Sequence, residues 1–150
     1  MSFIIFKKKT FLPFGQSLFE VIFSIAILSL ILIGVVSLTT KTVANENFSK
    51  NNALATKFAQ EAMEWIREER DSDWSNLASR TPATNINLGS LNWSSANPIL
   101  GTALSRSVNL TFQTVVDSND TIRVEVIVSW TDGQGSHQVV SVTDFTNWNR

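Results

Sequence analysis

The chain has 150 residues, a mean hydropathy close to zero and a formal net charge of −1. Three lysines near the N-terminus hide an acidic remainder: residues 16–150 carry 9 basic and 13 acidic side chains, which argues against a basic nucleic-acid-binding surface. The sequence has no cysteine, which excludes disulfide bonds, thiolate metal sites and a catalytic thiol.

The first predicted element is a membrane-length helix over residues 18–38, whose only charged side chain is Glu20. About 20 apolar residues suffice to cross a bilayer. A carboxylate at the bilayer centre costs roughly 2.5 to 3.5 kcal/mol on insertion scales, so Glu20 is a candidate functional residue. Three lysines at positions 7–9 precede the helix, and the nearest base after it is Lys41. The positive-inside rule therefore predicts a cytoplasmic N-terminus and an exported C-terminal part.

Three ordinary interpretations of this segment stay open. A secretory signal peptide would be cleaved near residues 42–44, although an apolar run of 21 residues is longer than such a signal needs. A plain single-pass anchor fits the length but explains neither Gly15 nor Glu20. The third interpretation is the buried core helix of a soluble protein.

The helix is predicted to continue to about Arg70, because residues 17–70 contain no proline and one glycine, Gly34. Its second half is amphipathic. The side chains expected to face a sheet are Ala44, Phe48, Ala55, Phe58, Ala62, Trp65 and Ile66, with Asn51 in the one polar gap. The side chains expected to form the solvated face are Lys50, Lys57, Glu61, Glu64 and Glu68.

A long connection is predicted over residues 71–105. It begins with turn-prone side chains at residues 71–73 and continues with many Ser, Asn, Thr and Gly residues. Trp74 and Trp93 lie in this connection, and Trp148 lies in the tail. Such tryptophans either lock loops onto the domain or contact a partner, and locking is the expected role.

An antiparallel β-meander is predicted over residues 106–145, because apolar and polar side chains alternate there. Two strands that reach Val116 and Trp130 are separated by a short turn at residues 117–120. A second turn begins at Asp132, and a third strand follows from His137 to about Phe145. A helix followed by such a meander is an α+β arrangement.

No catalytic or cofactor site is predicted. His137 is the only histidine, so a zinc site or a Cys/His dyad has no second ligand or partner, and a structural role is expected for it. Two groups of side chains offer oxygen ligands for calcium, but turn formation is the simpler role. They are Asp117, Asn119 and Asp120 in one turn, and Asp71 and Asp73 in the other. We therefore expect neither an enzyme nor a bound metal.

The N-terminal pattern of a basic leader, Gly15 and a glutamate five residues later resembles the class III signal of type IV prepilins and pseudopilins. The resemblance implies a pilin-like α+β fold, with a leader at 1–15, the membrane or filament-core half of the helix at 16–40, and an exported globular domain at 41–150. Within this family, the chain is most similar to minor subunits of the type IV pilus V kind and the type II secretion I kind. The residues that carry this similarity are 60–67, Asp73 with Trp74, and the closing strand at 126–130.

The resemblance also implies a mechanism. A prepilin peptidase would cut between Gly15 and Gln16 and methylate Gln16, and Glu20 would meet the N-terminal amine of a neighbouring subunit. The implied partners are the peptidase, other pilin or pseudopilin subunits, an inner-membrane assembly platform and the lipid bilayer, with no direct nucleic-acid partner. The side chains implied to pack in the filament core are Val21, Ile22, Ile25, Leu28 and Leu32.

This interpretation predicts a single-pass inner-membrane precursor that later joins a periplasmic or cell-surface filament, as a minor and priming subunit. A second functional class stays open, namely an anchored binding or adhesive domain that never polymerises. A third, a membrane-tethered enzyme, would need a polar cluster that the sequence does not offer. Pilus, secretion pseudopilus and DNA-uptake systems are not distinguished by these motifs.

Overall fold

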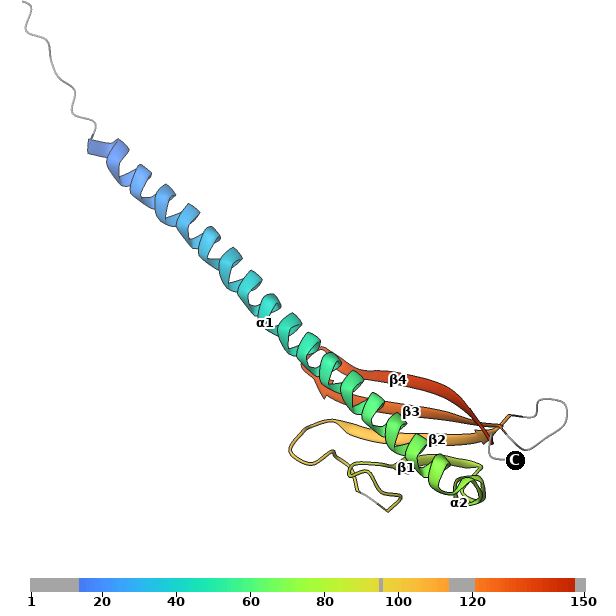
Figure 1. Ribbon diagram of the computed structural model, residues 1–150. Coiled ribbons are helices and arrows are strands. Elements are labelled where there is room, and N and C mark those ends of the chain that lie inside the picture. Colours follow the sequence, from blue (N-terminus) through green and yellow to red (C-terminus); the bar gives the residue numbers. More distant parts are fainter. Residues whose placement is uncertain (1–13, 95, 114–120, 148–150) are drawn as a thin grey trace, which may run out of the picture. The chain divides into compact units, whose positions relative to one another are not determined.

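The computed structural model describes residues 14–94, 96–113 and 121–147, with side chains from residue 18 onward, and is shown in Figure 1. The chain divides into two compact units, residues 1–43 and 44–150. The two units differ in side-chain burial. The described side chains of the first unit are exposed, whereas the second unit has a hydrophobic core.

The long helix α1 (Phe14–Ser72) contributes to both units. It ends where the turn-prone residues 71–73 were expected to stop it. From Leu18 onward it is apolar and long enough to cross a membrane. The predicted membrane-length helix is therefore present.

The second unit contains a four-stranded antiparallel sheet in the order β1-β2-β3-β4. The strands are β1 (Ala83–Asn87), β2 (Ser105–Phe112), β3 (Thr121–Asp132) and β4 (Gly135–Thr146). The C-terminal part of α1 lies across one face of the sheet, as Figure 1 shows. A long apolar helix followed by a small antiparallel sheet is a pilin-like α+β architecture, as the sequence predicted.

The connection predicted over residues 71–105 is more ordered than expected, and that part of the prediction is wrong. It contains a short helix, α2 (Trp74–Ser79), and the edge strand β1. Asp73 caps α2 by accepting a hydrogen bond of 3.1 Å from the Asn76 amide, so the turn-prone side chain starts a helix. A six-residue helix is too short to show a hydrophobic period.

Strand β1 does not show a regular alternation of apolar and polar side chains, for a different reason. Its pairing register with β2 shifts between Ala83 and Ile86, and Asn85 has a positive φ of 54°. This irregularity interrupts the alternation of faces on which strand prediction depends. The predicted turn at residues 117–120, Val116 and the tail after Asn147 lie outside the described residues.

The core of the second unit lies between α1 and the sheet. On α1 the predicted stripe is buried or half-buried, and Ala59 and Met63 join it although they were not predicted. The side chains of β2 and β3 with 0% of their surface exposed are Val108, Leu110, Ile122, Val124, Val126 and Val128. Alternate residues of β2 and β3 thus face the helix, which confirms the predicted alternation of apolar and polar side chains.

Candidate functional site

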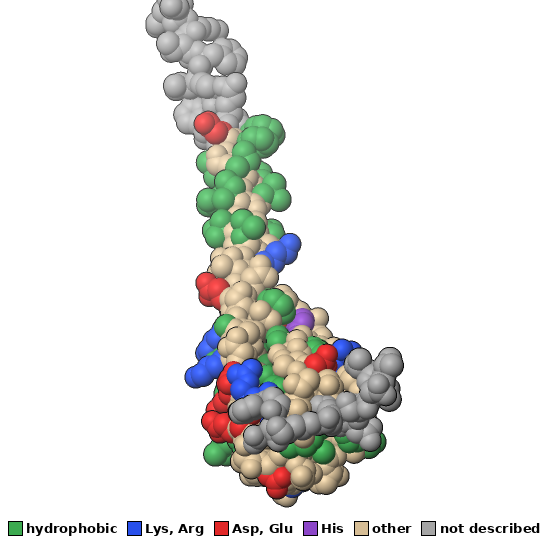
Figure 2. Space-filling model, turned by 45° about the vertical axis from the view of Figure 1, so that its right-hand side comes forward, with side chains coloured by type: hydrophobic (Ala, Val, Ile, Leu, Met, Phe, Trp, Pro, Cys, Tyr) green, Lys and Arg blue, Asp and Glu red, His purple; other side chains and the backbone are tan. Residues whose placement is uncertain are grey.

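The first part of the candidate site is the apolar surface of α1 in the first unit. Every described side chain from residue 18 to residue 43 is exposed, and Figure 2 shows hydrophobic side chains gathered along this part of the helix. The five residues expected to pack in a filament core share this exposure, at 55–60% of their surface: Val21, Ile22, Ile25, Leu28 and Leu32. So large an apolar surface needs a lipid or protein environment.

The hydroxyl side chains of this segment are satisfied within the helix. Ser29 donates to the carbonyl of Ile25 at 2.8 Å, and Thr39 donates to that of Val35 at 2.9 Å. Thr40 and Thr42 bond in the same way to carbonyls four residues earlier, each at 3.0 Å. A segment in lipid must satisfy its polar groups internally, so these bonds suit a bilayer. Sequence reasoning missed them, although the four-residue spacing from hydroxyl to apolar residue signals them.

Glu20 is the one charged side chain in the described part of the apolar segment before Lys41. It is exposed and makes no ion pair with a described residue. Gln16 lies four positions earlier on α1, about 6 Å along the helix axis. Gly15 and Gln16 fall in the first turn of α1, where the backbone alone is described. The predicted cleavage position and Glu20 therefore share one helix end.

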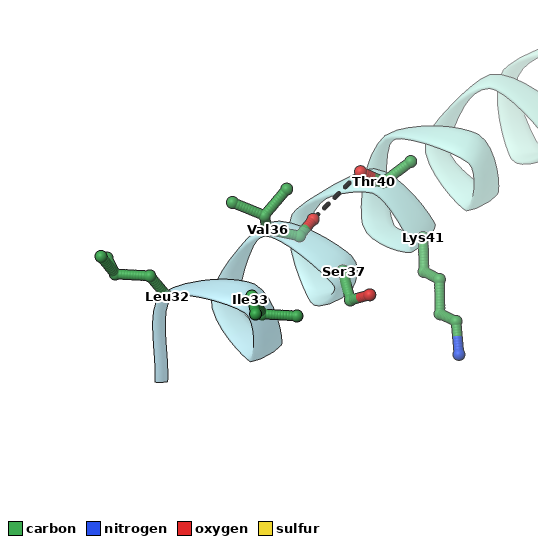
Figure 3. A pocket seen from close by; sticks show the side chains of 6 residues that line it. All are labelled: Leu32, Ile33, Val36, Ser37, Thr40 and Lys41. Carbon is green, nitrogen blue, oxygen red and sulfur yellow. Dashed lines mark hydrogen bonds between the residues drawn. The ribbon is translucent and has the colours of Figure 1, made fainter. Parts of the chain in front are cut away.

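A shallow groove lies further along the same helix. Figure 3 shows the side chains that line it: Leu32, Ile33, Val36, Ser37, Thr40 and Lys41. All six come from α1 and all are exposed, so the groove is a space between side chains of a single helix. It has no second wall among its lining residues and is not an enclosed ligand site.

Arg106 is the buried charged residue of the second unit, with 2% of its surface exposed. Its Nε donates to the Leu88 carbonyl at 2.7 Å, and its Nη1 donates to the Phe58 carbonyl at 2.9 Å and to Glu61 Oε2 at 3.1 Å. Burial lowers the pKa of the Arg106 guanidinium, and Glu61 partly offsets this effect. Through these bonds the side chain connects β2 to α1 and to the segment that follows β1.

The Arg106 contact changes the predicted role of Glu61. This glutamate was assigned to the solvated face of the helix, together with Lys57. Its side chain is 47% exposed, and it forms an ion pair with Arg106. Glu61 lies at the border of the buried stripe and contacts Arg106 on β2. Spacing along the helix predicts pairs within the helix, so it does not predict this contact.

Trp93 fixes the segment between β1 and β2 to α1. Its indole Nε1 donates to Glu69 Oε2 at 2.8 Å, and its ring lies 4.9 Å from that of Trp65. The guanidinium of Arg80 lies over the Trp93 ring, with its Cζ 4.8 Å from the ring centroid. Trp74 also packs against the core. Both tryptophans have the expected locking role, but the surface they lock onto includes the helix; Trp148 lies outside the described residues.

His137 belongs to an aromatic and polar cluster near the β3–β4 turn. Its ring lies 5.0 Å from that of Phe48 and 5.4 Å from that of Trp130, and its Nε2 lies 3.0 Å from Asp132 Oδ1. Asp132 also accepts a hydrogen bond of 2.8 Å from the Gln134 amide. That amide, followed by His137, lowers the pKa of Asp132. The structural role expected for His137 fits these contacts.

Trp130 Nε1 is buried and has no hydrogen-bond partner of normal geometry among the described residues. It lies close enough to Asp132 to contribute weakly to the low pKa of that carboxyl group. The cluster thus packs the β3–β4 turn against Phe48 on α1. His137 is the only histidine of the sequence, so the cluster holds no second histidine.

The acidic side chains considered as calcium ligands are engaged elsewhere where they are described. Asp71 pairs with Arg70 at 2.7 Å, and Asp73 caps α2. The other three, Asp117, Asn119 and Asp120, lie outside the described residues. Within residues 14–94, 96–113 and 121–147 no group of three or more His, Cys, Asp or Glu side chains is placed to hold a metal ion.

Comparison of the chain with family models, with curated proteins and with solved structures finds no match. The functional argument therefore depends on the residues and geometry of this chain alone.

Proposed function

We propose that the chain is a minor pilin or pseudopilin subunit, made as an inner-membrane precursor and assembled into a type IV pilus or a type II secretion-like filament. The observation that carries the proposal is Glu20, a carboxylate with no ion-pair partner among the described residues, on an exposed apolar helix five residues after Gly15. The small antiparallel sheet that follows the helix supports it, because this order of elements is pilin-like.

The chemistry of the proposed assembly follows from the cost of burying charge. Cleavage after Gly15 creates a positive amine at Gln16, and a neighbouring subunit offers the carboxylate of Glu20. A charge in an apolar environment is tolerated when it is paired. Removing one partner leaves the other charge buried without compensation, which destabilises the assembly by about 3 to 5 kcal/mol. The pair therefore fixes the axial register of neighbouring helices.

The exposed apolar side chains perform two successive roles in this proposal. In the precursor they contact lipid, where the internally bonded hydroxyls of Ser29, Thr39, Thr40 and Thr42 cost little. In the filament the side chains from Val21 to Leu32 contact the helices of neighbouring subunits. Small residues such as Ser24 and Gly34 permit close approach of helix backbones.

Replacing Glu20 tests the proposal. We expect Glu20→Ala to insert into the membrane and to be processed, because neither step uses the carboxylate, but to be lost from filaments that contain the wild-type chain. The measurement is the ratio of filament-bound to membrane-bound protein in sheared cell fractions. The matched control is Glu46→Ala, which removes an exposed glutamate of the same helix outside the apolar segment. Normal incorporation of Glu20→Ala would refute the proposed charge pair.

The anchored binding domain is the alternative, and it makes opposite predictions. Such a protein keeps its full N-terminus and is indifferent to both Glu20 and Gly15. A chain of full length in cells that process other prepilins would favour it.

A further inference from the structure

The two edges of the sheet in the second unit differ. Strand β1 is short, has a register shift between Ala83 and Ile86, and uses the Asn85 amide to bond the side chain of Asn109 at 2.8 Å. An irregular edge of this kind resists pairing with another strand. Strand β4 has none of these features, because it pairs with β3 without interruption from Gly135 to Thr146.

Figure 1 shows β4 along one margin of the sheet, with β3 on one side and no described strand on the other. In an antiparallel ladder, alternate residues direct their backbone groups toward one neighbour. Since β4 has one neighbour among the described strands, half of its backbone groups face away from β3. Twelve residues of regular edge offer a template for a further strand.

The side chains of β4 do not protect this edge. The strand has no lysine, arginine or proline, which are common protecting residues. Its one carboxylate, Asp144, is held by Arg123 of β3 through bonds of 2.8 and 3.0 Å. On the same open face, Val140 and Val142 expose 42% and 52% of their surfaces beside the half-buried Ile127.

We propose that β4 pairs antiparallel with β4 of a second copy of this chain, about a two-fold axis at Ser141. The register follows from the side chains. With Ser141 opposite itself, Val140 of each copy faces Val142 of the other, and Asp144 faces the amide of Gln138. Apolar side chains thus meet apolar ones and no like charges are opposed.

Neighbouring registers are worse. A shift by one residue is forbidden, because it places core-facing side chains opposite open-face side chains. A shift by two residues places Val142 opposite Gln138 in one direction, or Val140 opposite Asp144 in the other. The register at Ser141 is the one that pairs both exposed valines, and the resulting interface is self-complementary, as a two-fold contact requires.

Cysteine cross-linking of the full chain in detergent micelles tests the proposal cleanly, because the chain has no cysteine of its own. Directly opposed residues of an antiparallel pair have Cα atoms about 4.5 to 5.5 Å apart, a distance that suits a disulfide. We expect Ser141→Cys to shift from monomer to dimer on a non-reducing gel under mild oxidation.

The matched control is Ser136→Cys on the same strand. In the proposed register the two copies of residue 136 are ten positions apart, about 30 Å along the strands. Ser136→Cys should therefore remain monomeric under the oxidation that converts Ser141→Cys. A second variant adds Val140→Lys and Val142→Lys to Ser141→Cys, and it should lose the cross-link while its far-UV circular dichroism is unchanged.

The proposal is overturned if Ser141→Cys stays monomeric, or if Ser136→Cys cross-links equally, since the latter would indicate random collision. A cross-link that survives the two added lysines also overturns it. The proposal concerns the second unit alone, so peptidase processing at Gly15 has no bearing on it, and failure of either idea is distinguishable from failure of the other.

Discussion

At the scale of single residues, Arg106 shows how one buried charge connects segments that are distant in sequence. It bonds the carbonyls of Leu88 and Phe58 and the carboxylate of Glu61, 18, 48 and 45 residues away. A guanidinium suits this position because its planar fork offers several donors in fixed directions. The residue belongs to the fold of the second unit, and its contribution is measurable as stability.

We predict that Arg106→Met lowers the free energy of unfolding by about 1 to 3 kcal/mol, because a buried carbonyl acceptor loses its donor. The Glu61 carboxylate is half-exposed and can be hydrated, which limits the loss. The measurement is the urea midpoint of the full chain in detergent, followed by tryptophan fluorescence.

The control for that prediction is Arg123→Met, which removes a solvent-exposed ion pair with Asp144. Exposed pairs contribute little, so its midpoint should lie near that of the wild type. Equal midpoints for Arg106→Met and Arg123→Met would contradict the role assigned to Arg106.

Single residues also show the limits of sequence reasoning. Glu20 was identifiable because one charge in a long apolar segment is conspicuous without any tertiary knowledge. Arg106 was not, because as the second residue of β2 it resembles an ordinary polar residue at a strand boundary. Its burial results from contacts with α1 and with the segment after β1, which no local pattern encodes.

At the scale of elements, the segment between β1 and β2 is held by close contacts. Gly89 is buried, and a Cβ atom at this position would lie 1.9 Å from the Ala96 carbonyl oxygen. On the other side of the segment, Asn97 Oδ1 accepts a hydrogen bond of 3.1 Å from the Arg106 amide. The loop and β2 are therefore packed as one structure.

We predict that Gly89→Ala destabilises the second unit by about 1 to 3 kcal/mol, the usual cost of overpacking. Gly133→Ala is the matched control, because a Cβ atom there meets nothing within 4 Å. Limited proteolysis of both variants, with urea midpoints alongside, measures the effect. Equal protease resistance of the two variants would show that the backbone near Ala96 moves aside.

The β3–β4 turn gives a prediction about acid. The pKa of Asp132 is lowered below its ordinary value of 3.8, chiefly by the Gln134 amide. A lowered carboxyl pKa stabilises the fold above the ordinary value, and this contribution is lost as pH falls through the folded-state pKa. Arg123 also lowers the pKa of Asp144, but this pair is solvent-exposed and its contribution to stability is small.

We therefore expect Asp132→Asn to have a lower urea midpoint than the wild type at neutral pH, with the two curves converging as pH falls below 3.8. Urea midpoints measured from pH 7 to acid for both proteins test this. Curves that stay parallel throughout would contradict the stabilising role of the charged form.

The elements themselves were predictable to different degrees. The long helix, β2, β3 and β4 have enough residues to show a period of 3.6 or 2, and their types follow from the sequence. Helix α2 and strand β1 have six and five residues, and β1 is irregular. Their structure depends on a cap at Asp73 and on pairing with β2, which become visible in three dimensions.

At the scale of the whole molecule, the chain combines an exposed apolar helix with a folded unit that has its own core. The helix could be predicted from composition alone, because apolar length is a property of the sequence. The chemistry proposed at its N-terminus concerns Gly15, Gln16 and Glu20, and it depends on enzymes and neighbouring subunits.

The most direct test of the account is the intact mass and N-terminal sequence of the protein from membranes with and without a prepilin peptidase. We predict a peptidase-dependent product that begins at methylated Gln16, and we predict that Gly15→Val blocks its formation. A full-length chain in both samples would contradict the account and favour an anchored domain, and a product beginning near Asn45 would instead identify a secretory signal peptide.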